Sequence, residues 1–245
     1  MSKLLPCLDI DHRKVVKGTK FKDVKEIADP LTLAKRYAEE GADELVFYDI
    51  SASYEGRGLF YDLIEEIRAA IDIPLVVGGG IRTVSDAKKL VEIGADKVSI
   101  NSIALTNPSI VREMSEAIGK EKVVVSLDVQ REGDAWILFA KGGRENTGID
   151  ALAWAEKMEA LGAGELVINS IDEDGVQNGY NIPLMQSIRQ RVNLPIIASG
   201  GAGKVEHFVE AITDGGADGV LAASVFHFGQ LTIPEVKEAL NTLEK

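Results

Sequence analysis

The sequence predicts a (β/α)₈ barrel, an α/β fold in which eight parallel strands alternate with eight helices. Three observations support this prediction. Short apolar runs alternate with longer amphipathic segments along the 245 residues, each kind occurs eight times, and the second half of the chain repeats the first. Runs rich in Val, Ile and Leu without strict alternation are typical of parallel strands covered on both faces. Because barrels of this length are commonly one unit, we expect a single domain over residues 1–245.

The apolar runs have the length of strands and come at regular intervals. They lie at Leu4–Leu8, Leu45–Tyr48, Leu75–Val77, Lys97–Ile100, Val123–Leu127, Leu166–Ile168, Ile196–Ala198 and Val220–Ala222. Each run precedes a segment in which apolar residues recur at helical spacing. These segments are Pro30–Glu40, Leu59–Ala70, Val84–Ile93, Ser109–Ile118, Ala151–Leu161, Ile182–Val192, Val205–Asp214 and Pro234–Leu243.

Two local patterns refine these expectations. Asp29-Pro30 and Asn107-Pro108 each place a capping residue before a first-turn proline, which marks a helix start. After the fifth run, Gly133-Asp134 separates Val129–Arg131 from Trp136–Phe139. This is the pattern of a β-hairpin, so we expect one inserted there.

The two halves of the chain match at a nearly constant offset. Residues 41–46 match residues 162–167, and residues 72–80 match residues 193–201, both with an offset of 121. No linker or change in composition divides the halves. The sequence therefore predicts an internal repeat, roughly 1–120 and 121–245, of four strand-helix units each.

The composition excludes several classes of function. With 27 basic and 39 acidic residues the net charge is −12, so we expect no nucleic-acid or anionic membrane surface. One cysteine and three well-separated histidines predict neither a disulfide nor a zinc site, and we expect no metal or cofactor. No apolar stretch reaches the roughly 18 residues of a membrane span, so we expect a cytoplasmic protein.

Two aspartates end strands on opposite sides of the predicted barrel. Asp9 follows the first run and Asp128 the fifth, and the active site of such a barrel lies at these carboxyl ends. A pair of carboxylates across one opening suits general acid-base catalysis. A single aspartate here would more simply be a helix cap or a loop anchor, but the paired placement favours catalysis.

Glycine-rich turns follow the third and seventh runs, and a small polar pair follows the next run in each half. Such turns and helix starts present backbone N–H groups to phosphate, so we predict two phosphate sites. The alternative is that the glycines only permit a turn. The candidate residues are Gly80, Asn101 and Ser102 in the first half, and Ser199, Gly200, Gly201, Gly203, Ala223 and Ser224 in the second.

Charged residues suggest two further features. Residues 12–25 contain six Lys and Arg residues against one Asp, so this loop is either a cover for an anionic substrate, with Lys17 as the favoured contact, or a solvated charged loop. At the opposite end of the barrel, charges of alternating sign begin four strands. They form either a ring of ion pairs or ordinary surface charge, and they are Lys3, Glu44, Lys97 and Glu165.

Motifs along nearly the whole chain resemble the cyclase subunits of imidazole glycerol phosphate synthase. They are Cys-Leu-Asp-Ile at 7–10, Val-Val-Lys-Gly at 15–18, Asp-Glu-Leu-Val-Phe at 43–47, Val-Gly-Gly-Gly-Ile at 77–81, Ala-Asp-Lys-Val-Ser-Ile-Asn at 95–101, Asn-Thr-Gly-Ile at 146–149, Asp-Gly at 174–175, Gly-Tyr at 179–180 and Ala-Ser-Gly-Gly-Ala-Gly-Lys-Val-Glu-His-Phe at 198–208.

The resemblance implies a lyase of histidine biosynthesis. Its substrate would be a bisphosphorylated N-phosphoribulosyl-formimino aminoimidazole carboxamide ribotide, which reacts with ammonia to give imidazole glycerol phosphate and aminoimidazole carboxamide ribotide. Asp9 and Asp128 match the acid-base pair and Lys17 the lysine of the mobile first loop. Gly80, Asn101 and Ser102 match one phosphate site, and Gly201, Ala223 and Ser224 the other. Polar positions near the substrate fall on Asn169, Asp174 and Gly175.

The resemblance also implies a heterodimer. Ammonia would come from a glutaminase subunit docked on the amino-terminal face of the barrel, and the four charged residues would form the gate of an ammonia channel. Lys3 stands where arginine is more usual, and a lysine lacks the planar fork of arginine. Asn169 and Asn181 stand where Thr and Asp also occur in relatives.

Three other functions remain open from the sequence. The sister aldose-ketose isomerase of the same pathway is also a two-half barrel with paired aspartates, but it needs no ammonia route. A diverged cyclase-like subunit in the amidation of a surface sugar, or a non-catalytic scaffold, is disfavoured by the intact Asp9 and Asp128.

Overall fold

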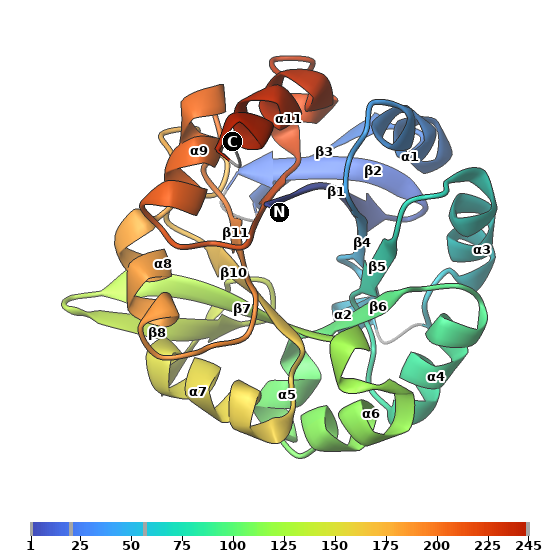
Figure 1. Ribbon diagram of the computed structural model, residues 1–245. Helices are drawn as coiled ribbons and strands as arrows, with labels where there is room; N and C mark the ends of the chain where they lie inside the picture. The colour runs from blue at the N-terminus through green and yellow to red at the C-terminus, as the bar shows by residue number, and fades with distance from the viewer. Residues whose placement is uncertain (1, 20–21, 56–57, 244–245) are drawn as a thin grey trace.

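The computed structural model describes residues 2–19, 22–55 and 58–243 and shows a ring of parallel strands surrounded by helices (Figure 1). The ring closes because the last strand pairs with the first, and its pairings are all parallel. The strands in ring order are β1(Lys3–Asp11), β4(Leu45–Asp49), β5(Leu75–Gly78), β6(Lys97–Ile100), β7(Val123–Glu132), β10(Glu165–Ser170), β11(Ile196–Ser199) and β12(Gly219–Ala222). This architecture confirms the predicted (β/α)₈ fold.

Helices cover the outside of the ring at or near the predicted positions. The longer ones are α1(Pro30–Glu39), α3(Tyr61–Ala70), α4(Val84–Glu92), α6(Ile110–Ile118), α7(Ala151–Leu161), α8(Ile182–Arg189), α9(Val205–Thr213) and α11(Ile233–Thr242). Shorter turns lie between them: α2(Ala52–Glu55), α5(Ser102–Thr106), α10(Ser224–His227) and the 3₁₀ turn η1(Lys120–Lys122). None of the described helices has the length and apolar content that crossing a bilayer requires.

Capping residues fix where two of these helices begin. The Asp29 carboxylate accepts the Thr32 N–H at 2.9 Å and starts α1, and the Asp150 carboxylate accepts the Ala153 N–H at 2.8 Å and starts α7. The prediction that Asn107 caps a helix was wrong. Asn107 instead ends α5, its side chain accepts the Ser109 hydroxyl at 2.8 Å, and α6 begins only after a turn.

Two antiparallel hairpins extend the barrel strands at the carboxyl end. β8(Ala135–Ala140) pairs with β7 and confirms the predicted hairpin, while β9(Glu145–Asp150) adds a strand that was not predicted. The segment expected as a basic loop is the second hairpin, formed by β2(Lys14–Thr19) and β3(Lys22–Ala28). It forms because Val15 and Val16 are buried, and because His12 and Arg13, both with positive φ, turn the chain back from β1.

Apolar side chains form two separate cores. One fills the space between the barrel and the helices, with Phe47, Ile64 and Phe208 among its fully buried members. The other lies inside the barrel, where strand residues alternate between the two faces. Its members are Leu5, Cys7, Val46, Val76, Val124, Val167, Ile197, Leu221 and Ala223, with Tyr48 packed against them.

Matching contacts occur in the two halves of the barrel. Arg68 donates to the Asp96 carboxylate at 2.9 Å, and that carboxylate also accepts the backbone N–H of Leu75, which begins β5. Arg189 donates to Asp218 at 3.0 Å, and Asp218 accepts the backbone N–H that begins β11. The internal repeat and the single domain stay predictions, and these paired contacts support the repeat.

We expect Asp150→Ala to lower the free energy of unfolding by about 1 kcal/mol, because α7 loses the side chain that caps its first turn. Chemical denaturation measures this change. Asp134→Ala is the matched control, since the Asp134 side chain is fully exposed at a hairpin turn. Equal effects of the two substitutions would contradict the assignment of the cap.

Candidate active site

A cavity of about 790 Å³ lies at the carboxyl ends of the barrel strands. Most of the predicted site residues line it, although they come from seven of the eight strands or the loops that follow them. These residues are Asp9, Gly80, Asn101, Ser102, Asp128, Asn169, Asp174, Gly175, Ser199, Gly200, Gly201, Ala223 and Ser224. The fold therefore brings the predicted residues together at the carboxyl-end opening of the barrel, which we call the mouth.

Asp128 is the most constrained group in the cavity. It is 7% exposed, and each of its carboxylate oxygens accepts one side-chain amide, from Asn101 at 3.0 Å and from Asn169 at 2.9 Å. Burial raises the pKa of Asp128 to about 6, the two amide donors act in the opposite direction, and the charge of Asp174 adds to the rise. A substantial fraction of Asp128 therefore carries a proton slightly below neutral pH.

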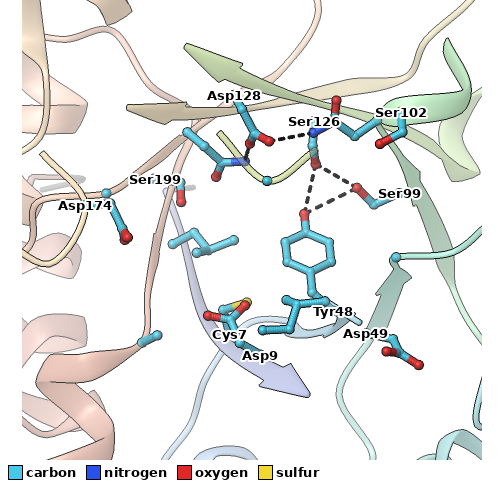
Figure 2. A pocket seen from close by; sticks show the side chains of 18 of the residues that line it. Cys7, Asp9, Tyr48, Asp49, Ser99, Ser102, Ser126, Asp128, Asp174 and Ser199 are labelled. Atoms are coloured by element: carbon cyan, nitrogen blue, oxygen red, sulfur yellow. Dashed lines mark hydrogen bonds between the residues drawn. The ribbon is translucent and has the colours of Figure 1, made fainter. Parts of the chain in front are cut away.

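Asp9 lies across the cavity from Asp128 in a different environment (Figure 2). It is partly exposed at the end of β1, and the Cys7 thiol lies 3.7 Å from one of its oxygens. On the neighbouring strand its register partner is Tyr48. The two carboxylates thus share one mouth but differ in burial and in hydrogen-bond donors.

The two glycine-rich turns have the geometry that requires glycine. Gly79 and Gly80 have φ of +87° and +67°, and Gly200 and Gly201 have φ of +91° and +111°. A Cβ atom on Gly79 would collide with the Asp49 carbonyl oxygen. Because these turns have no side chains, their backbones stay accessible from the cavity, as binding of an oxyanion by N–H groups requires.

The residues before the two short helices at the mouth have closely similar backbone conformations. Asn101 has φ −137° and ψ −78° before α5, and Ala223 has φ −128° and ψ −72° before α10. Ser102 and Ser224 begin these helices, and both line the cavity. The mouth therefore offers two turns of the same shape on two sides of one cavity.

Two predicted contacts are not placed in the cavity. The backbone N–H of Gly203 donates to Nδ1 of His207 at 3.1 Å, and Gly203 does not line the cavity. Burial, with the charge of Lys204, lowers the pKa of His207, which keeps its ring neutral and able to accept this bond. The side chain of Lys17 lies outside the described residues.

Three cations at the mouth were not singled out from the sequence. Arg82 lines the cavity beside the first glycine turn and donates to the Ala52 carbonyl at 3.2 Å. Lys141 and Arg144 line it from the turn between β8 and β9. Lys141-Gly142-Gly143-Arg144, just after the second strand of the predicted hairpin, was the available signal, but the sequence did not show that this turn folds back over the mouth.

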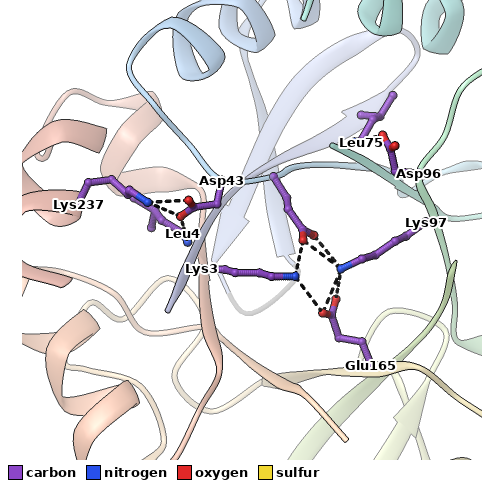
Figure 3. Close-up of polar contacts among 9 residues, drawn as sticks. Lys3, Leu4, Asp43, Leu75, Asp96, Lys97, Glu165 and Lys237 are labelled. Atoms are coloured by element: carbon purple, nitrogen blue, oxygen red, sulfur yellow. Dashed lines mark hydrogen bonds and ion pairs between the residues drawn. The ribbon is translucent and has the colours of Figure 1, made fainter. Parts of the chain in front are cut away.

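At the opposite end of the barrel, the four predicted charges form a closed ring of ion pairs (Figure 3). The Lys97 ammonium lies 3.0 Å from both oxygens of Glu44 and 3.1 Å from the nearer oxygen of Glu165. The Lys3 ammonium lies 2.6 Å from Glu44 and 3.9 Å from Glu165. Lysine at position 3 therefore completes the ring.

Burial and ion pairing shift the pKa values of two residues in this ring. Burial raises the pKa of Glu165, and Lys97 opposes that rise. For Lys3, burial lowers the pKa, but the hydrogen bond and charge of Glu44 outweigh it and hold the pKa above its ordinary value. The side chains of Glu44 and Glu165 are each only 5% exposed, so the ring closes the amino end of the barrel interior with paired charges.

Comparison with known proteins shows similarity over nearly the whole chain. The model of the family described as histidine biosynthesis protein matches residues 3–232. The imidazole glycerol phosphate synthase subunit HisF of Oceanobacillus iheyensis is 50% identical over 243 residues, which cover 99% of this chain and 95% of that protein.

We expect Asp128→Asn to raise the free energy of unfolding at pH 7.5 by about 1–2 kcal/mol, with a smaller gain at pH 5. The folded carboxyl, with its pKa at about 6, binds more protons than the unfolded one, so its contribution to stability falls as the pH rises from about 4 to 6. At pH 7.5 nearly all of the buried carboxyl is ionised, and asparagine removes that charge. Denaturation at both pH values checks this, with Asp134→Asn as control. A loss of stability, or a gain equal at both pH values, would contradict it.

Proposed function

The chain belongs to the histidine biosynthesis protein family, as a cyclase subunit of imidazole glycerol phosphate synthase, and from this premise we propose that Asp9 and Asp128 carry out the acid-base chemistry of ring closure. The observation that carries the proposal is that two carboxylates with unlike surroundings face one cavity. Environments that separate the pKa values of two carboxyl groups separate their roles as acid and base.

Asp128 is the proton donor in this proposal. Its raised pKa keeps part of the population protonated near neutral pH, and the amides of Asn101 and Asn169 hold its position. Asp9, more exposed, accepts a proton as a carboxylate. A substrate that spans the mouth would meet the two groups from opposite sides.

The two glycine turns suit the bisphosphorylated substrate N-phosphoribulosyl-formimino aminoimidazole carboxamide ribotide. One phosphate binds at the turn containing Gly80, with Asn101 and Ser102, and the other at the turn containing Gly201, with Ala223 and Ser224. Arg82, Lys141 and Arg144 supply positive charge at the mouth. Backbone donors and these few cations reconcile an anionic substrate with a chain of net charge −12.

Ammonia reaches the mouth through the barrel in this proposal. A glutaminase subunit binds the amino-terminal face, where the ring of Lys3, Glu44, Lys97 and Glu165 is the gate. Neutral ammonia is small and uncharged, so it crosses the barrel interior at less cost than ammonium would. The products are imidazole glycerol phosphate and aminoimidazole carboxamide ribotide.

We expect the chain alone to convert the ribulosyl substrate when an ammonium salt is supplied at elevated pH. Asp9→Asn and Asp128→Asn should each lower kcat at least a hundredfold, because a general acid or base contributes about 10²–10⁴-fold. Loss of substrate followed by absorbance measures this, and circular dichroism checks the fold. Asp134→Asn is the control. Unimpaired aspartate variants would overturn the catalytic assignment, and isomerisation of the aldose precursor as the main activity would point to the sister enzyme.

We expect Lys97→Met to lower the free energy of unfolding by about 3 kcal/mol, because among the described residues it leaves two buried carboxylates with only Lys3 as a cationic partner. Lys157→Met is the matched control, since Lys157 lies on outer helix α7, where its ammonium contacts the Trp154 ring 5.3 Å away. Urea denaturation measures both. A change of less than 1 kcal/mol for Lys97→Met would show that the ring does not hold these carboxylates in place.

A further inference from the structure

Three hydroxyl groups meet inside the barrel, between the ring of charges and the mouth. The Tyr48 hydroxyl lies 3.0 Å from Ser126 Oγ and 3.3 Å from Ser99 Oγ, and the two serine oxygens lie 2.8 Å apart (Figure 2). Ser99 is 3% and Ser126 6% exposed. We name these three side chains the hydroxyl triangle.

The triangle lies midway along the barrel axis because side chains on one face of a strand are two residues apart. On β6, Ser99 stands between Lys97 of the ring and Asn101 of the mouth. On β7, Ser126 stands one step below Asp128. Ser99 is therefore one inward-facing position from the charge ring, and Ser126 is one inward-facing position from the acid-base pair.

On the side that faces the ring of charges, the hydroxyl triangle is surrounded by aliphatic side chains. Val46, Val76, Val124 and Val167 belong to the interior core, and Tyr48 packs against that core. The cavity of the mouth reaches down to Tyr48, Ser99 and Ser126. A small polar molecule that crosses the aliphatic layer loses its hydrogen bonds to water, and the triangle is where it first regains partners.

The chemistry of the triangle fits ammonia better than ammonium. Each hydroxyl donates one hydrogen and accepts another, so three can satisfy one another in a cycle. Ammonia can enter the cycle at its longest edge, between Tyr48 and Ser99, accepting one O–H and donating one N–H. Burial raises the pKa of Tyr48, so the phenol stays neutral and keeps its hydrogen. A neutral site of this kind gives a cation no counter-charge.

The position of the tyrosine ring depends on one glycine. A Cβ atom on Gly78 would lie 2.5 Å from Cε1 of Tyr48, so the ring lies directly against the backbone of β5. This packing directs the phenol across the barrel to the two serines on β6 and β7. The triangle is thus a defined arrangement rather than a chance contact of polar side chains.

We propose that Tyr48, Ser99 and Ser126 form a binding site for one ammonia molecule on its way from the charge ring to the acid-base pair. The proposal rests on the proposed ammonia route and adds to it a site within the barrel. Tyr48 and the serines do not supply the proton chemistry; they shorten the distance over which ammonia lacks hydrogen-bond partners.

The test compares two sources of ammonia in the complex of the full chain with its glutaminase subunit. Glutamine supplies ammonia through the barrel, whereas ammonium chloride at pH 8.5 supplies it from the open mouth. The measured quantity is the ratio of the glutamine-dependent to the ammonium-dependent rate of imidazole glycerol phosphate formation. We expect Tyr48→Phe to lower this ratio about five- to tenfold, the effect of one lost hydrogen bond.

Tyr37→Phe is the matched control, because Tyr37 is also buried and its hydroxyl also makes a hydrogen bond, to His227 at 2.6 Å, but it lies outside the barrel interior. Its ratio should equal that of the unmodified complex. Ser126→Ala should lower the ratio as Tyr48→Phe does. This second variant tests the site without altering the tyrosine side chain.

The outcomes separate this proposal from the proposed function. A ratio that is unchanged or raised in both Tyr48→Phe and Ser126→Ala overturns the ammonia site, while the proposed function stands. An equal loss with both sources of ammonia also overturns it, because the triangle would then act on the chemistry at the mouth. An unmodified complex without ammonium-dependent turnover overturns the proposed function itself.

Discussion

Closure of the barrel between β1 and β12 is the constraint on which the rest of the structure depends. Backbone pairing from Lys3 with Gly219 to Pro6 with Ala222 completes the ring, and it leaves the strands with a single interior. Inside a closed ring, residues two apart on each strand are stacked in layers along the axis. The charged ring, the aliphatic layer, the hydroxyl triangle and the carboxylates of the mouth are successive layers of this one stack.

Each end of the stack holds charged side chains whose burial costs desolvation free energy. At the amino end the cost is offset within the ring, since Glu44 and Glu165 share two ammonium groups at close range. At the mouth, Asp128 has two amide donors but no cation at contact distance among the described residues, and its pKa is raised accordingly. The difference between the ends suits their proposed roles. Charges held in ion pairs close a passage, whereas a carboxyl that is hydrogen-bonded to amides and not ion-paired can exchange a proton.

The sequence predicted those features that depend on order along the chain. Strand ends are local, so Asp9, Asp128 and the glycine turns could be assigned to one mouth once eight strand-helix units were recognised. Features that depend on contacts across strands were missed. The chain turns back from β1 into β2 at His12 and Arg13, residues that carry no turn signal, and the hydroxyl triangle requires the registers of three strands. Gly203 was assigned to phosphate because the sequence did not show that His207 takes its N–H.

The repeat explains how one scaffold gives its two aspartates different properties. With the offset of the halves, Asn169 beside Asp128 corresponds to Tyr48 beside Asp9, and both pairs are in register on neighbouring strands. Asn169 donates to its aspartate, but Tyr48 turns its hydroxyl away to Ser126. The second amide donor of Asp128, Asn101, corresponds to alanine in the other half.

Equivalent positions therefore hold amides around one carboxylate and a tyrosine and a methyl group around the other. The tyrosine that stands beside Asp9, where the other half has an asparagine, is also the residue that places a hydroxyl in the barrel interior, since Tyr48 reaches serines on β6 and β7. The corresponding positions in the other half, Leu221 and Cys7, carry no hydroxyl. The asymmetry of the acid-base pair and the one-sided placement of the hydroxyl triangle thus have a common origin in residue 48.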